Sequence, residues 1–113
     1  MESIADFSWM KDLLNGQVIE RFKLENYWAV AVEIPADDEA HPSQYHFRLL
    51  FFPHMGKRPV LALNLERSLL GSPCLTEQAG KQHLVLAEAQ ETMNYEEFRR
   101  WALARAREDL HLR

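Results

Sequence analysis

The stretch YWAVAVEI, residues 27–34, alternates with a period of two and stops at Pro35. Trp28, Val30, Val32 and Ile34 point to one side of an extended chain, and the residues between them point to the other. Aromatic and β-branched residues favour strands, so this stretch predicts a β-strand that belongs to the core of a sheet.

Further strands are expected beside this one. They are short runs separated by turn-forming residues, and they cover residues 18–24, 45–52, 60–65, 74–78 and 83–87. Most connections between them are short, which favours antiparallel neighbours. Two connections are longer: an acidic loop bounded by prolines at 35–43 and an irregular crossing at 68–73.

A helix is expected near the C-terminus. Asn94 and Glu97 have the spacing of a capping box, and Met93 and Phe98 have the spacing of a hydrophobic staple around it. The apolar stripe of this helix is Tyr95, Phe98, Ala102, Ala106 and Leu110.

A second helix is expected at the N-terminus, from Ser3 as its N-cap to Leu14, with Asn15-Gly16 as its stop. The residues expected to face the core are Phe7, Met10 and Leu14, with Trp9 and Leu13 on the flanks of this stripe.

This element order predicts an α+β fold: a mainly antiparallel, meander-like sheet of five or six strands with an N-terminal and a C-terminal helix. The chain has 113 residues, of which 47% are hydrophobic and 27% are charged. Residues 1–113 are therefore expected to form a single domain with a core of its own.

Charge and cysteine content argue against several classes of protein. The net charge of −4 repels polyanions and no basic stripe is present, so nucleic acid is not an expected partner. Cys74 is the single cysteine and cannot form an internal disulfide, which fits a reducing compartment. The sequence shows no secretory signal and no apolar run of membrane-spanning length. A cytoplasmic protein without membrane association is expected.

The two faces of the sheet are both expected to be apolar. We assign to the core face Trp28, Val30, Val32, Tyr45, Phe47, Leu49, Phe51, Leu61, Leu63, Leu65, Leu84 and Leu86. The opposite face then carries Ala29, Ala31, Leu50, Phe52, Val60, Ala62 and Val85, with a polar end at His46, Arg48, Asn64 and Glu66.

An antiparallel sheet with a solvated face normally carries Thr, Lys, Glu and Ser there, so this opposite face is expected to be covered. Three coverings remain open: the N-terminal helix, a second copy of the chain, or another molecule. The residues expected to contact a partner are Leu50, Phe52, Val60, Ala62 and Val85.

Candidate catalytic chemistry centres on Cys74 and His83, which would face each other in the simplest register of the last hairpin. A thiolate–imidazole pair is the minimum for nucleophilic catalysis. No oxyanion-hole glycine motif accompanies the pair, and a lone cysteine usually packs as a small apolar group. His46 and His54 bracket one predicted strand and would lie about 26 Å apart, too far to share a metal. No cofactor motif is found, so neither a metal nor a cofactor is expected.

The C-terminal half resembles the type III secretion chaperone-like small α+β proteins. The resemblance covers Leu63-Asn64-Leu65, the crossing at 68–73, the hairpin at 74–87, and the helix that opens with Met93-Asn94-Tyr95-Glu96-Glu97-Phe98. A tight turn replaces the helix expected between the third and fourth strands. The resemblance implies a non-enzymatic dimer that binds a partner protein.

The leading hypothesis is a non-catalytic protein-interaction or chaperone-like module, whose partner is another protein or a second copy of the chain in a homodimer. The alternatives are a small-molecule ligand-binding domain and a small enzyme that uses Cys74 and His83.

Overall fold

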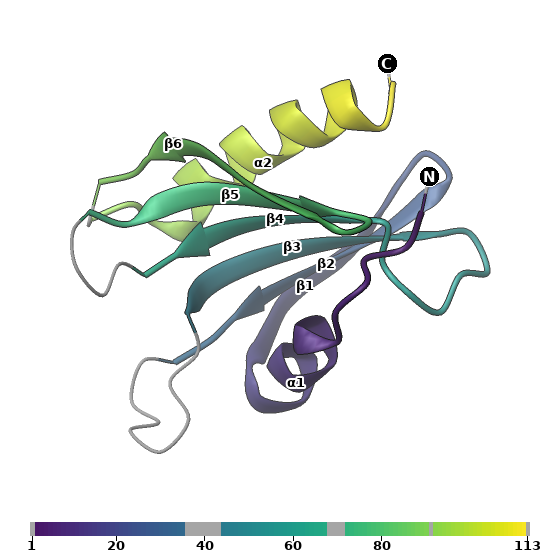
Figure 1. Ribbon diagram of the computed structural model, residues 1–113, viewed down its shortest axis with the longest axis horizontal. Helices are drawn as coiled ribbons and strands as arrows, with labels where there is room; N and C mark the ends of the chain where they lie inside the picture. The colour runs from purple at the N-terminus through teal and green to yellow at the C-terminus, as the bar shows by residue number, and fades with distance from the viewer. Residues whose placement is uncertain (1, 36–43, 68–71, 91, 113) are drawn as a thin grey trace.

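The computed structural model describes residues 2–35, 44–67, 72–90 and 92–112. Within these ranges the chain forms two helices and six strands (Figure 1). In chain order they are α1 (Ser8–Asn15), β1 (Gln17–Leu24), β2 (Tyr27–Glu33), β3 (Tyr45–Pro53), β4 (Leu61–Glu66), β5 (Cys74–Ala79), β6 (Gln82–Glu88) and α2 (Tyr95–Asp109). Most of the loop predicted at 35–43 and of the crossing predicted at 68–73 lies outside the described residues.

The six strands form one antiparallel sheet in the order β1-β2-β3-β4-β5-β6, so every strand pairs with its neighbour in sequence. The predicted α+β fold with a meander sheet and a helix at each end is confirmed. β1 and β6 are the two edge strands. Figure 1 shows α1 and α2 on opposite sides of the sheet.

α2 covers one face and forms the larger part of the core. Phe98, Ala102, Ala106 and Leu110 pack against the sheet beside Leu49, Phe51, Leu61, Leu63 and Leu65. The predicted capping box at its start is present, because the Asn94 side chain accepts a hydrogen bond from the Glu97 amide and the Glu97 side chain accepts one from the Asn94 amide. This local signal explains why the start of α2 was predicted correctly.

The N-terminal segment and α1 cover the centre of the other face. Ile4 and Trp9 pack on Leu50 and Ala62, and Leu13 packs against the cluster of Val32, Ile34 and Tyr45. Two backbone hydrogen bonds attach the segment to the sheet rim: the amide of Ile4 donates to the Pro59 carbonyl at 2.9 Å, and that of Ala5 to the Gly80 carbonyl at 2.9 Å.

The predicted assignment of β2 to the two faces is wrong. Ala29 and Ala31 pair with Phe51 and Leu49 and lie beneath α2, whereas Val30 and Val32 lie on the α1 side. Trp28 shares the Val30 side of the strand. Alternation shows that neighbouring residues face opposite ways, but both sets on β2 are apolar. Only the register with β3 therefore decides which set meets α2.

Irregularities in the ladder account for other errors. A register shift between Tyr45 and Phe47 places Tyr45 on the α1 side and Phe47 beneath α2, although the sequence predicts one face for both. Val60, predicted for the opposite face, is buried in the cluster beneath α2. Leu84, predicted for the core, is exposed on the edge strand β6.

The N-terminal helix starts later than predicted, at Ser8 rather than after Ser3. Its N-cap is Phe7, which makes no side-chain capping bond. Just before it, Oδ1 of Asp6 accepts from the Ser8 amide at 3.0 Å and from the Ser8 hydroxyl at 2.8 Å. The predicted stop at Gly16 is confirmed.

Candidate functional site

Cys74 and His83 do not form the pair that the sequence predicts. Cys74 lies opposite Glu88 in the last hairpin, and His83 lies opposite Gln78. The His83 Nε2 is instead 2.6 Å from Oε2 of Glu66. Burial, followed by the negative charges of Glu66 and Glu88, raises the pKa of the Cys74 thiol. A nucleophilic cysteine needs the opposite shift, toward the thiolate.

The histidines are dispersed. His46 Nε2 lies 3.5 Å from Oε2 of Glu33, and its ring stacks on Phe47. Burial, then the nearby charge of Arg67, lowers the pKa of His46. Within the described residues, no three His, Cys, Asp or Glu side chains come together as a metal site.

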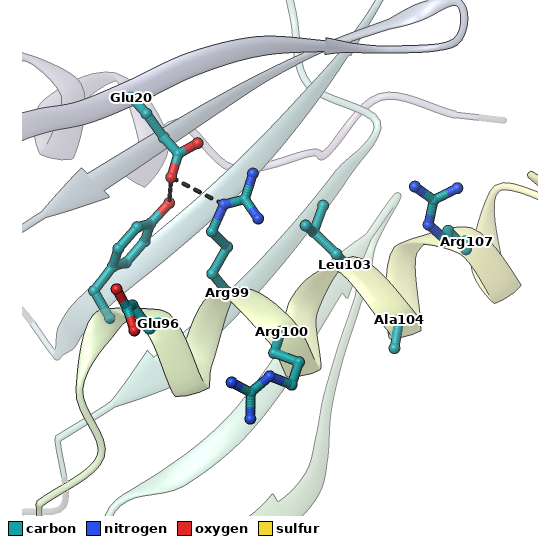
Figure 2. A pocket seen from close by; sticks show the side chains of 8 residues that line it. Glu20, Glu96, Arg99, Arg100, Leu103, Ala104 and Arg107 are labelled. Atoms are coloured by element: carbon teal, nitrogen blue, oxygen red, sulfur yellow. Dashed lines mark hydrogen bonds and ion pairs between the residues drawn. The ribbon is translucent and has the colours of Figure 1, made fainter.

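A groove between β1 and α2 is lined by arginines and carboxylates (Figure 2). Glu20 on β1 accepts hydrogen bonds from the Tyr95 hydroxyl at 2.6 Å and from Nε of Arg99 at 3.0 Å. Figure 2 shows that Arg100 points away from Arg99, and that Arg107 lies at the far end of the groove. The guanidinium groups do not converge on one point, so this groove ties α2 to the edge strand rather than forming an anion site.

The most unusual feature is a fully buried arginine, Arg48, at the centre of the α1 side of the sheet. Its Nε donates to Oδ1 of Asn64 at 2.9 Å, and one terminal nitrogen donates to the Asp12 carboxylate at 2.8 Å. It also donates to Ser8 Oγ at 3.1 Å and to Oε1 of Gln78. A buried charge is tolerated only when it is paired and hydrogen-bonded in this way.

This network extends on both sides of Arg48. Asn64 donates to Thr76 Oγ1 at 3.2 Å, and Gln78 donates to Oδ2 of Asp6 at 2.8 Å. The network therefore joins β3, β4 and β5 to the N-terminal segment and α1. Because Asp12 must face Arg48, the network fixes the rotation of α1 about its own axis.

The rotation of α1 is the opposite of the one predicted from its apolar stripe. Trp9 and Asp12 are buried against the sheet and Leu13 is half-buried. The predicted core stripe faces solvent instead: the exposed fractions are 59% for Phe7, 46% for Met10 and 83% for Leu14. At about 100° per residue, Phe7, Met10 and Leu14 fall on the side of the helix opposite Trp9 and Asp12.

A hollow beside α1 continues this apolar surface. It is lined by Leu13, Arg21, Trp28 and Val30, and Trp28 is 48% exposed. Leu13 adjoins Met10 at the i−3 position of the helix, so the hollow and the exposed stripe are neighbours. We call the combined set the α1-side surface; it consists of Phe7, Met10, Leu13, Leu14, Trp28 and Val30.

The five residues predicted to contact a partner lie in different surroundings. Leu50 and Ala62 are fully buried beneath the N-terminal segment, and Val60 is buried beneath α2. Phe52 is half-buried with its ring edge-on to Trp9, at 5.7 Å between centroids. Val85, at 70% exposure, is the one of the five that is open to solvent. A partner role for these residues stays a prediction.

Sequence reasoning missed the exposed residues of the α1-side surface because it assigned them to the core. A signal was present in Asp12, a carboxylate one turn from Trp9 on the side of the helix opposite Phe7 and Leu14. A charged residue there, together with Arg48 in the middle of an apolar strand, was the sequence evidence for a buried ion pair.

Comparisons of this chain with models of protein families, with curated proteins and with solved structures find no match. Neither of the two described helices has the length and apolar character needed to cross a membrane.

Proposed function

We propose that this protein is a non-catalytic protein-interaction or chaperone-like module, and that it binds its partner through the α1-side surface. The observation that carries the proposal is the orientation of α1. A buried Arg48–Asp12 pair holds the helix so that Phe7, Met10 and Leu14 face solvent. Exposed apolar side chains gathered on one surface are typical of interaction sites.

The buried polar network selects the orientation of α1. Turning the helix over would bury Phe7, Met10 and Leu14, but it would expose Trp9, which is now 7% exposed, and would separate Asp12 from Arg48. Buried polar networks are retained in some proteins because they select one arrangement over others. The selected arrangement here is the one that presents an apolar surface.

The other hypotheses have less support. An enzyme built on Cys74 and His83 is disfavoured, because the two residues do not lie opposite each other in the last hairpin. The raised pKa of the Cys74 thiol also disfavours it. A homodimer, which the resemblance to type III secretion chaperone-like proteins implies, remains one form of the proposed interaction. Val85 and Leu84 on the edge strand β6 are exposed and offer it a second contact region.

The test needs a position that tolerates change. Ala62 is fully buried, so a charge there would disturb the fold as well as any association. Leu14 is 83% exposed and is the better position. A photo-crosslinking amino acid at Leu14 would be compared with the same group at Ala104, which is exposed on α2.

In extract of the source cells, or with a second copy of the chain, we expect the crosslinking group at Leu14 to form covalent adducts with the partner. The same group at Ala104 should form none. Excess unlabelled protein should compete for these adducts, and excess Leu14→Glu variant should not. Size-exclusion chromatography with light scattering would separate self-association from binding of another protein. A monomer that forms no competed adduct from Leu14 would overturn the proposal.

A further inference from the structure

We infer that the partner of the α1-side surface is an amphipathic helix that carries carboxylates beside its apolar stripe. This inference rests on the proposed function and adds the chemistry of the partner. Three observations carry it: the sign of the charges around the hollow, their lack of partners within the described chain, and the area of sheet that α1 leaves open.

The charges around the hollow are positive. Arg21 lines the hollow itself, and Lys23 follows two residues later on the same side of β1, opposite Trp28. The chain as a whole has a net charge of −4, so this is a local basic border on an acidic protein.

These cations have no ion-pair partner among the described residues. The nearest carboxylates in sequence are directed elsewhere. Asp12 is buried against Arg48, and Glu20 is held on the α2 side by Tyr95 and Arg99. Glu25 is in the β1–β2 turn at the end of the hairpin. An incoming carboxylate would therefore meet Arg21 and Lys23 without displacing an internal partner.

The sign of these charges also argues against a second copy bound face to face. In a twofold dimer the same patch lies on both sides of the interface, so Arg21 and Lys23 would face a surface of the same positive charge. Like charges placed opposite each other across an interface cost affinity. An acidic segment of another protein satisfies these cations, whereas an identical surface does not.

The space beside α1 suits a helix. A helix with its side chains is about 10–12 Å wide, while a six-stranded sheet is about 24 Å across, and Arg21 and Trp28 beside α1 are exposed. Packed helices lie about 8–10 Å apart. A second helix beside α1 would place large apolar side chains in the hollow of about 430 Å³ and against Met10. Its flanking carboxylates would then lie over β1.

The test uses fluorescence anisotropy with the whole protein and designed helical peptides of about 18 residues, or five turns. An acidic peptide combines a leucine stripe with glutamates, a basic peptide replaces each glutamate by lysine, and a third has the acidic composition in scrambled order. We expect the acidic amphipathic peptide to bind at least about tenfold more tightly than either of the others, and binding to weaken with added salt.

Charge reversal provides the decisive comparison. The Arg21→Glu/Lys23→Glu variant should lose about tenfold in affinity for the acidic peptide and gain affinity for the basic one. Arg100→Glu, an equally exposed change on α2, should alter neither. Trp28→Ala should weaken both peptides alike, because it removes apolar contact and not charge.

Two results would overturn the inference: equal affinity for acidic and basic peptides, or an unchanged preference in the reversed variant. If either occurs while competed adducts still form from Leu14, the charge assignment fails and the proposed function stands. If the adducts from Leu14 are absent as well, the proposed function fails too.

Discussion

The carboxylate of Asp12 lies 2.8 Å from the guanidinium of Arg48. The side chain of Arg48 is 0% exposed and that of Asp12 is 6% exposed. The residues are 36 positions apart, one on α1 and one on β3. Their pairing decides which side of α1 meets the sheet. The exposed stripe of α1 follows from that orientation, whereas the pairing of β1 with β2 places Arg21 and Lys23 beside it.

Removing the carboxylate should destabilise the protein strongly. In Asp12→Ala, Arg48 would remain buried without its ionic partner, and such a loss costs about 3–5 kcal/mol. We expect a fall of this size in the free energy of unfolding, measured by urea denaturation with linear extrapolation.

The double variant Asp12→Leu/Arg48→Met serves as its control. It removes both charges and restores apolar volume, so it should be less destabilised than Asp12→Ala. If Asp12→Ala and the double variant lose equal stability, the ion pair does not have the role assigned to it.

The junction between α1 and β1 allows no side chain. A Cβ on Gly16 would lie 2.6 Å from the Asp12 carbonyl oxygen and 2.6 Å from Cγ1 of Val32. We expect Gly16→Ala to lower the free energy of unfolding by about 1–3 kcal/mol, the usual cost of overpacking. Asn15→Ala, one residue earlier and exposed, should change it by less than about 0.5 kcal/mol. Equal effects of the two changes would show that the junction has room to relax.

The sequence predicted the elements of this fold better than the directions of their side chains. Turn residues such as Glu25-Asn26 and Ala79-Gly80, and the Asn94–Glu97 box, are local signals, and they placed the strands and α2 within a few residues. The face of β2 and the rotation of α1 depend on contacts between distant residues. Both sides of β2 are apolar, and α1 has apolar residues on two sides, so patterning alone cannot choose between the orientations.

The candidate site was missed for the same reason. Hydrophobicity assigned Phe7, Met10 and Leu14 to the core because they form the most apolar stripe of α1. Only a pairing of Asp12 with Arg48 reverses that assignment. Each of the two is a charged residue among apolar neighbours, but the 36 positions between them hide the fact that they pair. Leu50 and Ala62 were correctly placed on the side opposite α2, but the helix that covers them was placed in the wrong rotation.

Stability should fall at alkaline pH partly because of Tyr45. Burial is the main cause that raises the pKa of Tyr45 to about 12, from 10.0 for an unperturbed tyrosine. Its phenol therefore ionises more readily in the unfolded chain. The contribution of Tyr45 is complete below about pH 10 and is lost as the pH rises to about 12.

Between about pH 10 and about pH 12, the ionisation of Tyr45 should lower the free energy of unfolding by about 2–3 kcal/mol. Tyr45→Phe keeps the ring beneath Arg48 and removes the ionisable group. Urea denaturation between about pH 9 and about pH 12 should show a smaller loss of stability in this variant than in the wild type. Parallel curves would contradict the role assigned to Tyr45.

The thiol of Cys74 should react slowly. Burial and the charges of Glu66 and Glu88 raise its pKa, so less thiolate is present at neutral pH than in a free cysteine. We expect iodoacetamide to alkylate Cys74 more slowly than a cysteine-containing peptide, as followed by mass spectrometry. In a Cys74→Ser background, Ser72→Cys provides an exposed control thiol that should react at nearly the rate of the peptide.

Glu88→Gln should accelerate the reaction of Cys74, because it removes one of the negative charges that disfavour the thiolate. Alkylation of Cys74 faster than the peptide would instead indicate an activated thiol, and would revive the hypothesis of an enzyme that uses Cys74.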